Sequence, residues 1–112
     1  MGDRVLYQVV SRKAGEIGPV VYSHWGAKAA PEVVSALRLR MGDRLSDVSY
    51  TSARLVQLIC SHDGNRGAGV WNAPAELTEA ESHADGGCVV INCDDWSVRA
   101  FGGYLKAEQF KA

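Results

Sequence analysis

Two mostly apolar stretches, separated by a polar segment, stand near the start of the chain. Val5 to Val10 and Pro19 to His24 are rich in β-branched and aromatic residues, which favour strands. The polar segment Lys13 to Glu16 lies between them and contains a glycine, as many hairpin turns do. The pattern therefore predicts a β-hairpin at the start of the chain.

Apolar residues then recur at spacings of three and four, which predicts two helices. Pro31 suits the first turn of the first helix, and Gly42 suits its end. Ser49 or Thr51 would cap the second helix, which we expect to be central and largely buried. The apolar face of the first helix comprises Val33, Val34, Leu37 and Met41, and that of the second comprises Leu55, Val56, Ile59 and Cys60.

Strand-like patterns return in the second half of the chain. Ala68 to Trp71 reads as a short strand, and Ala75 to Ala84 is polar and acidic, either a short helix or an exposed loop. Cys88 to Cys93 is a continuous apolar run, typical of a strand buried on both faces, and Ser97 to Phe101 follows as its hairpin partner. The tail from Tyr104 to Ala112 is either a frayed helix or an extra edge strand.

These elements follow one another as strand, strand, helix, helix, strand, strand, strand. The order predicts an α+β domain, with a mainly antiparallel sheet of about five strands and two helices packed on one face. A length of 112 residues suits a single domain, spanning residues 1–112, with one continuous core.

Charge and cysteine content restrict the class of protein. Lys and Arg number 12 and Asp and Glu number 13, so phosphate-driven binding of nucleic acid is not expected. Cys60, Cys88 and Cys93 show no paired spacing, which favours free thiols in a reducing compartment. Cys88 and Cys93 lie an odd number of residues apart in one strand, so we expect them on opposite faces. The start has no apolar signal core and no stretch is long enough to span a membrane, which predicts a cytoplasmic protein.

Histidines and neighbouring acids are the candidates for catalysis or metal binding: His24, His62, His83, Asp63 and Asp85. A histidine that activates a serine would give acyl transfer, but neighbouring strand residues point to opposite faces, so Ser23 and His24 do not form such a pair. A metal site would need three of the candidates to converge, and none has the spacing typical of zinc ligands. We predict no metal and no cofactor, and we keep His24, His83 and Asp85 as catalytic candidates.

Three tryptophans stand at the ends of predicted strands, each beside polar residues. Large aromatic side chains with a polar rim are typical of interaction surfaces. The alternative is that the tryptophans cover the core, since most tryptophans are largely buried. The predicted binding surface consists of Tyr22, His24, Trp25, Trp71, Asn72 and Trp96.

The segment Val-Tyr-Ser-His-Trp-Gly at 21–26 resembles small bacteriophage- and prophage-encoded proteins that carry a Tyr-x-His-Trp-Gly signature. The segments Ala53 to Leu55, Gly69 to Asn72 and Ser82-His83 extend the resemblance over most of the chain. The signature has a further glycine, and this chain has Ala27 in its place. The resemblance implies a phage origin, a bacterial host cell as the location and a host protein as the partner, for example a defence or regulatory complex that is inhibited.

The order of elements is also similar to that of amino-terminal-nucleophile hydrolases, such as proteasome subunits. Ser52 to Leu55, Gly86 to Val90 and the turn at Asp94-Asp95 occupy similar places. Those enzymes attack with a terminal Thr, Ser or Cys, whereas removal of Met1 would leave Gly2, which has no side chain to attack with. The likeness therefore implies a similar fold without the activity.

The residues and the resemblances together favour a non-enzymatic protein that binds a host protein. One alternative is a small hydrolase or transferase with His24 as general base, supported by His83, Asp85 or Asp63. Another is a structural or assembly component. A free sheet edge at the last strand would also allow a homodimer, because an exposed edge pairs readily with a copy of itself.

Overall fold

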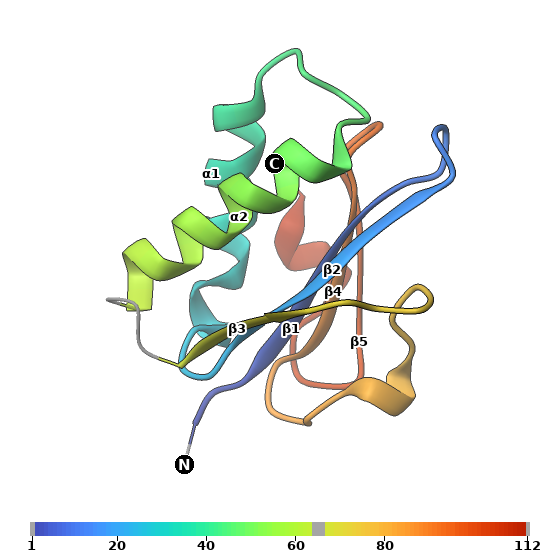
Figure 1. The fold of residues 1–112 in the computed structure, drawn as a ribbon. Coiled ribbons are helices and arrows are strands. Elements are labelled where there is room, and N and C mark those ends of the chain that lie inside the picture. The colour runs from blue at the N-terminus through green and yellow to red at the C-terminus, as the bar shows by residue number, and fades with distance from the viewer. Residues whose placement is uncertain (1, 64–66, 112) are drawn as a thin grey trace.

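The computed structural model describes residues 2–63 and 67–111 and contains one five-stranded sheet (Figure 1). The strand order is β3-β2-β1-β4-β5. Helices α1 (Ala30–Met41) and α2 (Val48–Asp63) lie together on one face of this sheet. The strands are β1 (Val5–Ser11), β2 (Glu16–Ser23), β3 (Ala68–Trp71), β4 (Gly87–Asn92) and β5 (Ser97–Phe101), and the short 3₁₀ turns are η1 (Ala27–Ala29), η2 (Glu79–Glu81) and η3 (Ala107–Phe110).

Antiparallel pairing dominates the sheet. β1 pairs with β2, β2 with β3, and β4 with β5 in antiparallel fashion. The central pair of β1 and β4 is parallel, because the chain passes through both helices and β3 before it returns beside β1. The predicted α+β class, with a mainly antiparallel sheet and two helices on one face, is therefore confirmed.

The first hairpin contains a β-bulge, and its second strand is longer than the sequence predicted. The register moves from Gln8 opposite Val20 to Val10 opposite Ile17, so Gly18 and Pro19 together face a single residue of β1. A bulge tolerates proline, which has no N–H to donate to the ladder. The predicted start of the second strand at Pro19 was wrong for this reason, since β2 begins at Glu16.

Asp47 caps the start of the second helix, α2. Its carboxylate Oδ1 accepts the N–H of Tyr50 at 3.0 Å, and its carbonyl accepts the N–H of Thr51 at 3.1 Å. Ser49 and Thr51 lie inside α2, so the prediction that one of them caps the helix was wrong. Aspartate before a first turn acts as a cap because its carboxylate accepts an otherwise unpaired N–H.

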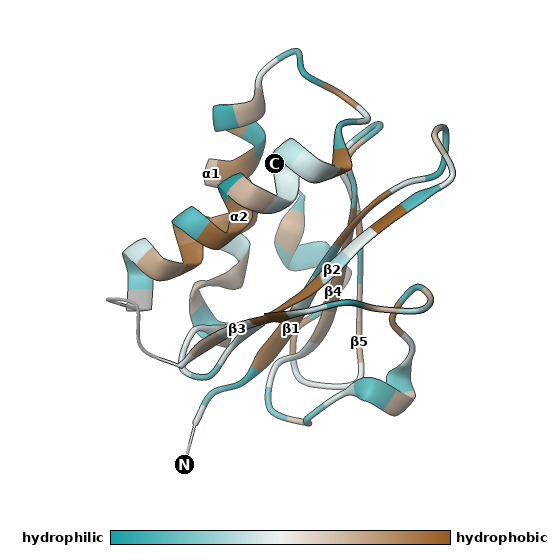
Figure 2. Ribbon diagram, viewed as in Figure 1, coloured by the Kyte–Doolittle hydropathy of each residue, from teal (hydrophilic) through white to brown (hydrophobic). Residues whose placement is uncertain are grey.

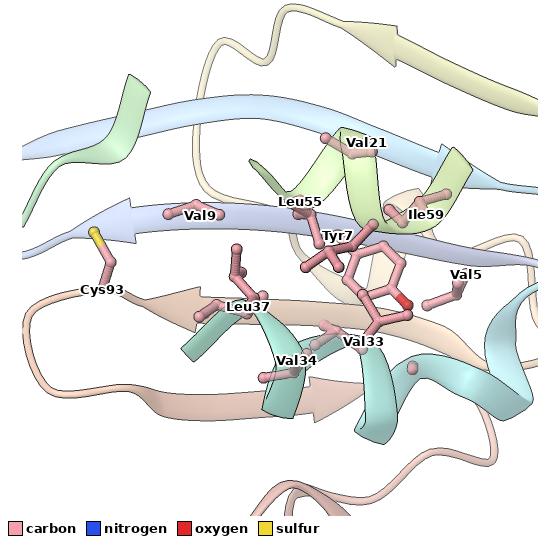
Figure 3. Packing of buried hydrophobic residues seen from close by; sticks show 14 of the residues in the cluster. Val5, Tyr7, Val9, Val21, Val33, Val34, Leu37, Leu55, Ile59 and Cys93 are labelled. Atoms are coloured by element: carbon pink, nitrogen blue, oxygen red, sulfur yellow. The ribbon is translucent and has the colours of Figure 1, made fainter. Parts of the chain in front are cut away.

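The helices bury their apolar faces on the sheet. The inner faces of both helices form one cluster with Val5, Tyr7 and Val9 of β1, and the ring of Tyr7 lies between strand and helices (Figure 3). Figure 2 shows brown, hydrophobic residues on the sides of the helices that face the sheet. All the residues predicted for the apolar face of α1 are buried: Val33, Val34, Leu37 and Met41.

The connection from β3 to β4, residues 72–86, covers the other face of the sheet (Figure 1). Leu77 packs there on Leu6, Val10 and Val90. Gln8, fully buried on β1, holds this connection: its Oε1 accepts the N–H of Leu77 at 2.8 Å, and its Nε2 donates to the carbonyl of Gly18 at 3.1 Å. The acidic segment is thus a loop with the single turn η2, and β4 is buried on both faces as predicted.

The backbone at Gly86-Gly87 crosses closely over that at Gly102-Gly103, where β4 begins and β5 ends. A Cβ added at Gly103 would lie 2.3 Å from the nitrogen of Gly87, so the two backbones approach more closely than any side chain allows. Beyond this crossing the tail forms η3 and packs Phe110 against the helical core. Within the described residues, no helix has the length and apolar character to cross a membrane.

Candidate functional site

Three rings from separate segments meet on the face opposite the helices. Tyr22 lies on β2, Trp71 ends β3, and His83 belongs to the connection before β4. The ring centre of Tyr22 is 6.0 Å from that of Trp71 and 5.5 Å from that of His83. The pairing of Val20 with Trp71 places Trp71 on the same face as Tyr22, because alternate residues of β2 share a face.

His24 and Trp25 extend this group beyond the end of β2. The Tyr22 hydroxyl and His24 Nδ1 are hydrogen-bonded at 2.5 Å, and the rings of His24 and Trp25 meet edge to face with centres 4.7 Å apart. Trp25 is 52% exposed and Trp71 is 43% exposed. We call this group the aromatic surface; it consists of Tyr22, His24, Trp25, Trp71 and His83.

Two glycines hold the imidazole of His24 in place. A Cβ at Gly67 would lie 2.6 Å from the Cβ of His24, and one at Gly2 would lie 2.8 Å from its Nε2. The N–H of His24 also donates to the carbonyl of Gly67 at 2.9 Å. One ring nitrogen of His24 is therefore hydrogen-bonded to Tyr22, and the other lies close to the backbone of Gly2.

An ion pair fixes the connection next to these rings. Both the backbone N–H and the side-chain Nε of Arg4 donate to Asp85 Oδ2, at 3.1 and 2.9 Å. The hydrogen bonds from Arg4 lower the pKa of Asp85 below its usual value. Ala84 and Asp85 have positive φ values of 65° and 49°, so the chain turns sharply here. Asp85, a catalytic candidate from the sequence, thus binds Arg4 and anchors the connection.

The structure separates the remaining predicted residues. Asn72 follows Trp71 and is exposed beside the aromatic surface. Trp96 lies in the turn from β4 to β5, at the opposite end of the sheet, where it is partly buried near Arg38 and Phe110. The prediction that Trp96 shares a surface with Trp25 was therefore wrong, because a strand's length separates the two ends of β4 and β5. His62 is exposed in the last turn of α2, and the side chain of Asp63 lies outside the described part.

Among the described residues, the serine and cysteine side chains considered beside the aromatic surface are buried or hydrogen-bonded. Burial raises the pKa of the nearby Cys88 thiol to about 11, which keeps it protonated near neutral pH. Ser23 is buried, and Ser82 Oγ donates to the carbonyl of Gly102 at 2.6 Å. Over residues 2–63 and 67–111, no three His, Cys, Asp or Glu side chains are placed to hold a metal ion.

Sequence reasoning missed two members of this region as binding residues. His83 was predicted only for catalysis, although its ring meets that of Tyr22 edge to face. Glu81 was not singled out, although it lines a hollow with Trp71. The segment from 72 to 86 contains four acidic residues and no Lys or Arg, a bias that signals a special surface, but its position over the sheet was not readable from the sequence.

Comparisons of the chain with protein-family models, with curated proteins and with solved structures find no match. The likenesses to phage proteins and to amino-terminal-nucleophile hydrolases accordingly stay predictions.

Proposed function

We propose that this protein is a binding module that recognises another protein through its aromatic surface. The observation that carries the proposal is the exposure of Trp25 and Trp71 beside three further rings. Large rings in water are unfavourable unless a partner covers them, and such patches mark interaction sites. Tryptophan and tyrosine are also the residues that most often dominate the affinity of an interface.

Rigidity supports the same proposal. Tyr22 and Trp71 lie on paired strands, and His24 packs closely against Gly2 and Gly67. His83 belongs to the connection that the Arg4–Asp85 ion pair fixes. Rings that are already fixed lose little conformational freedom when a partner binds, so more of the interaction energy contributes to affinity.

The proposed partner is a bacterial host protein, and the resemblance to phage-encoded proteins supports this choice. A protein of that origin would act in the cytoplasm of the host cell. β5 lies at one edge of the sheet, so pairing of its free edge with a second copy is proposed as a route to a homodimer.

The test begins with affinity capture from bacterial lysate, followed by purification of the captured partner and calorimetric titration. Trp25→Ala and Trp71→Ala are each expected to weaken binding about 30-fold or more, the effect of losing a dominant interface residue. Trp25→Ala should leave the melting temperature almost unchanged, because half of the side chain is already exposed.

Tyr50→Ala is the matched control. Tyr50 is an aromatic residue of α2 with 39% exposure and lies on the helical side of the sheet. This variant should bind the partner like the wild type. Unchanged affinity in both tryptophan variants, with the fold intact, would show that the aromatic surface is not the binding site.

A further inference from the structure

A small hollow opens beside the aromatic surface. It has a volume of about 250 Å³ and lies between the end of β3 and the connection that follows it. Trp71 forms one wall, and Asn72 and Pro74 continue it. The acidic side chains of Glu76 and Glu81 line the same hollow, and no Lys or Arg does. This hollow adjoins an exposed indole, and both charged side chains that line it are acidic.

The two acids differ in what already neutralises them. Glu76 forms ion pairs with Arg12 at 2.8 Å and with Arg99, which together lower its pKa below the usual value. Glu81 has no ion pair with any described residue. Its Oε1 accepts the N–H and the hydroxyl of Thr78 at 2.6 and 2.9 Å, while Oε2 has no hydrogen-bond partner among the described residues.

We propose that this hollow receives a basic side chain, arginine in the first place, from the protein partner. The cation would lie over the indole of Trp71 and bind Glu81 Oε2. A planar guanidinium suits both contacts, because it stacks on aromatic faces and donates in the plane to a carboxylate. The exposed amide of Asn72 is available to the backbone on either side of the arginine. This inference rests on the proposed function and names the chemistry of the partner.

The substitution Glu81→Gln separates charge from structure. Thr78 and Glu81 form a capping box at η2, and glutamine serves in that motif as well as glutamate does. The variant therefore removes the negative charge and keeps the local fold. Glu108→Gln, in the exposed turn η3, removes a charge remote from the hollow and is the matched control.

The experiment titrates N-acetyl-arginine methylamide into the labelled protein and follows the indole N–H signals by NMR. The signal of Trp71 should move, and that of Trp96 should not, because Trp96 lies at the other end of the sheet. The lysine analogue should bind more weakly and the neutral citrulline analogue hardly at all. Glu81→Gln should weaken arginine binding about three- to tenfold, whereas Glu108→Gln should not.

Equal binding of arginine and citrulline analogues, or an unchanged affinity in Glu81→Gln, would overturn the inference. The same variant is then titrated against the captured partner at two salt concentrations. If Trp71→Ala weakens the partner complex and Glu81→Gln changes neither its affinity nor its salt dependence, this inference fails and the proposed function stands. If Trp25→Ala and Trp71→Ala both leave partner binding unchanged, the proposed function fails.

Discussion

The two ends of the sheet use their polar and aromatic side chains in opposite ways. At the end where β1 and β4 finish, Asp94 accepts hydrogen bonds from Ser11 Oγ at 2.6 Å, Ser46 Oγ at 2.5 Å and the N–H of Lys13 at 2.8 Å. These bonds join the first hairpin, the loop before α2 and the turn after β4. At the other end, Trp25 is half exposed, and one carboxylate oxygen of Glu81 has no hydrogen-bond partner among the described residues.

The two ends therefore differ in whether their polar and aromatic groups already have partners within the described chain. Polar groups whose partners all come from the same chain stabilise the fold and have nothing left to offer a ligand. Exposed rings and an uncompensated charge contribute little to the fold and are free to bind. The Asp94 end is therefore a structural junction, and the end that bears the aromatic surface is the proposed site of recognition.

Removing the buried amide of Gln8 should loosen the connection that carries Glu81 and His83. Gln8→Leu should lower the free energy of unfolding by about 2–4 kcal/mol, because the buried N–H of Leu77 and the carbonyl of Gly18 lose their partner. Partner affinity should fall as well, since the connection helps to build the aromatic surface. Urea denaturation and calorimetry measure the two effects.

Gln57→Leu, on the exposed side of α2, is the control for Gln8→Leu and should change stability by less than about 0.5 kcal/mol. Full partner affinity in a destabilised Gln8→Leu protein would mean that the connection does not position the site.

A smaller effect is expected at the opposite end. Ser11 is buried, and its hydroxyl donates to Asp94 and accepts the N–H of Ala14 at 3.0 Å. Ser11→Ala should cost about 1–2 kcal/mol of unfolding free energy and leave partner binding unchanged. Ser97→Ala, which removes an exposed hydroxyl bonded to Asp95, is the control with a smaller effect. A loss of partner binding in Ser11→Ala would contradict the separation of the two ends.

The smallest effect concerns pH. Hydrogen bonds from Ser11, Ser46 and Lys13 lower the pKa of Asp94 from 3.8 to about 2. The stabilisation from its ionised form is therefore complete above about pH 4 and is lost as the pH falls through 2. Denaturation midpoints of the wild type should fall over this window more steeply than those of Asp94→Asn. Parallel curves for the two proteins would show that Asp94 does not carry this stability.

Much of the fold was readable from local pattern. β3 and β5 have the bounds that the sequence predicted, and Cys88 and Cys93 lie on opposite faces of the sheet because of their odd spacing. These features follow from periodicity and β-propensity, which act over a few residues. The start of α2 was misjudged because Asp47, Ser49 and Thr51 are all good caps, and only packing selects among them.

In the candidate site, too, contacts between chain neighbours were predictable and contacts between distant segments were not. The sequence alone predicted that Tyr22, His24 and Trp25 lie at one strand end, because they are neighbours in the chain. The folded chain brings Trp71 and His83 to the same place, pairs Asp85 with Arg4, and leaves Trp96 at the opposite end of the sheet. Those outcomes depend on strand order, register and the path of residues 72–86, which are fixed by long-range burial around Gln8 and Leu77.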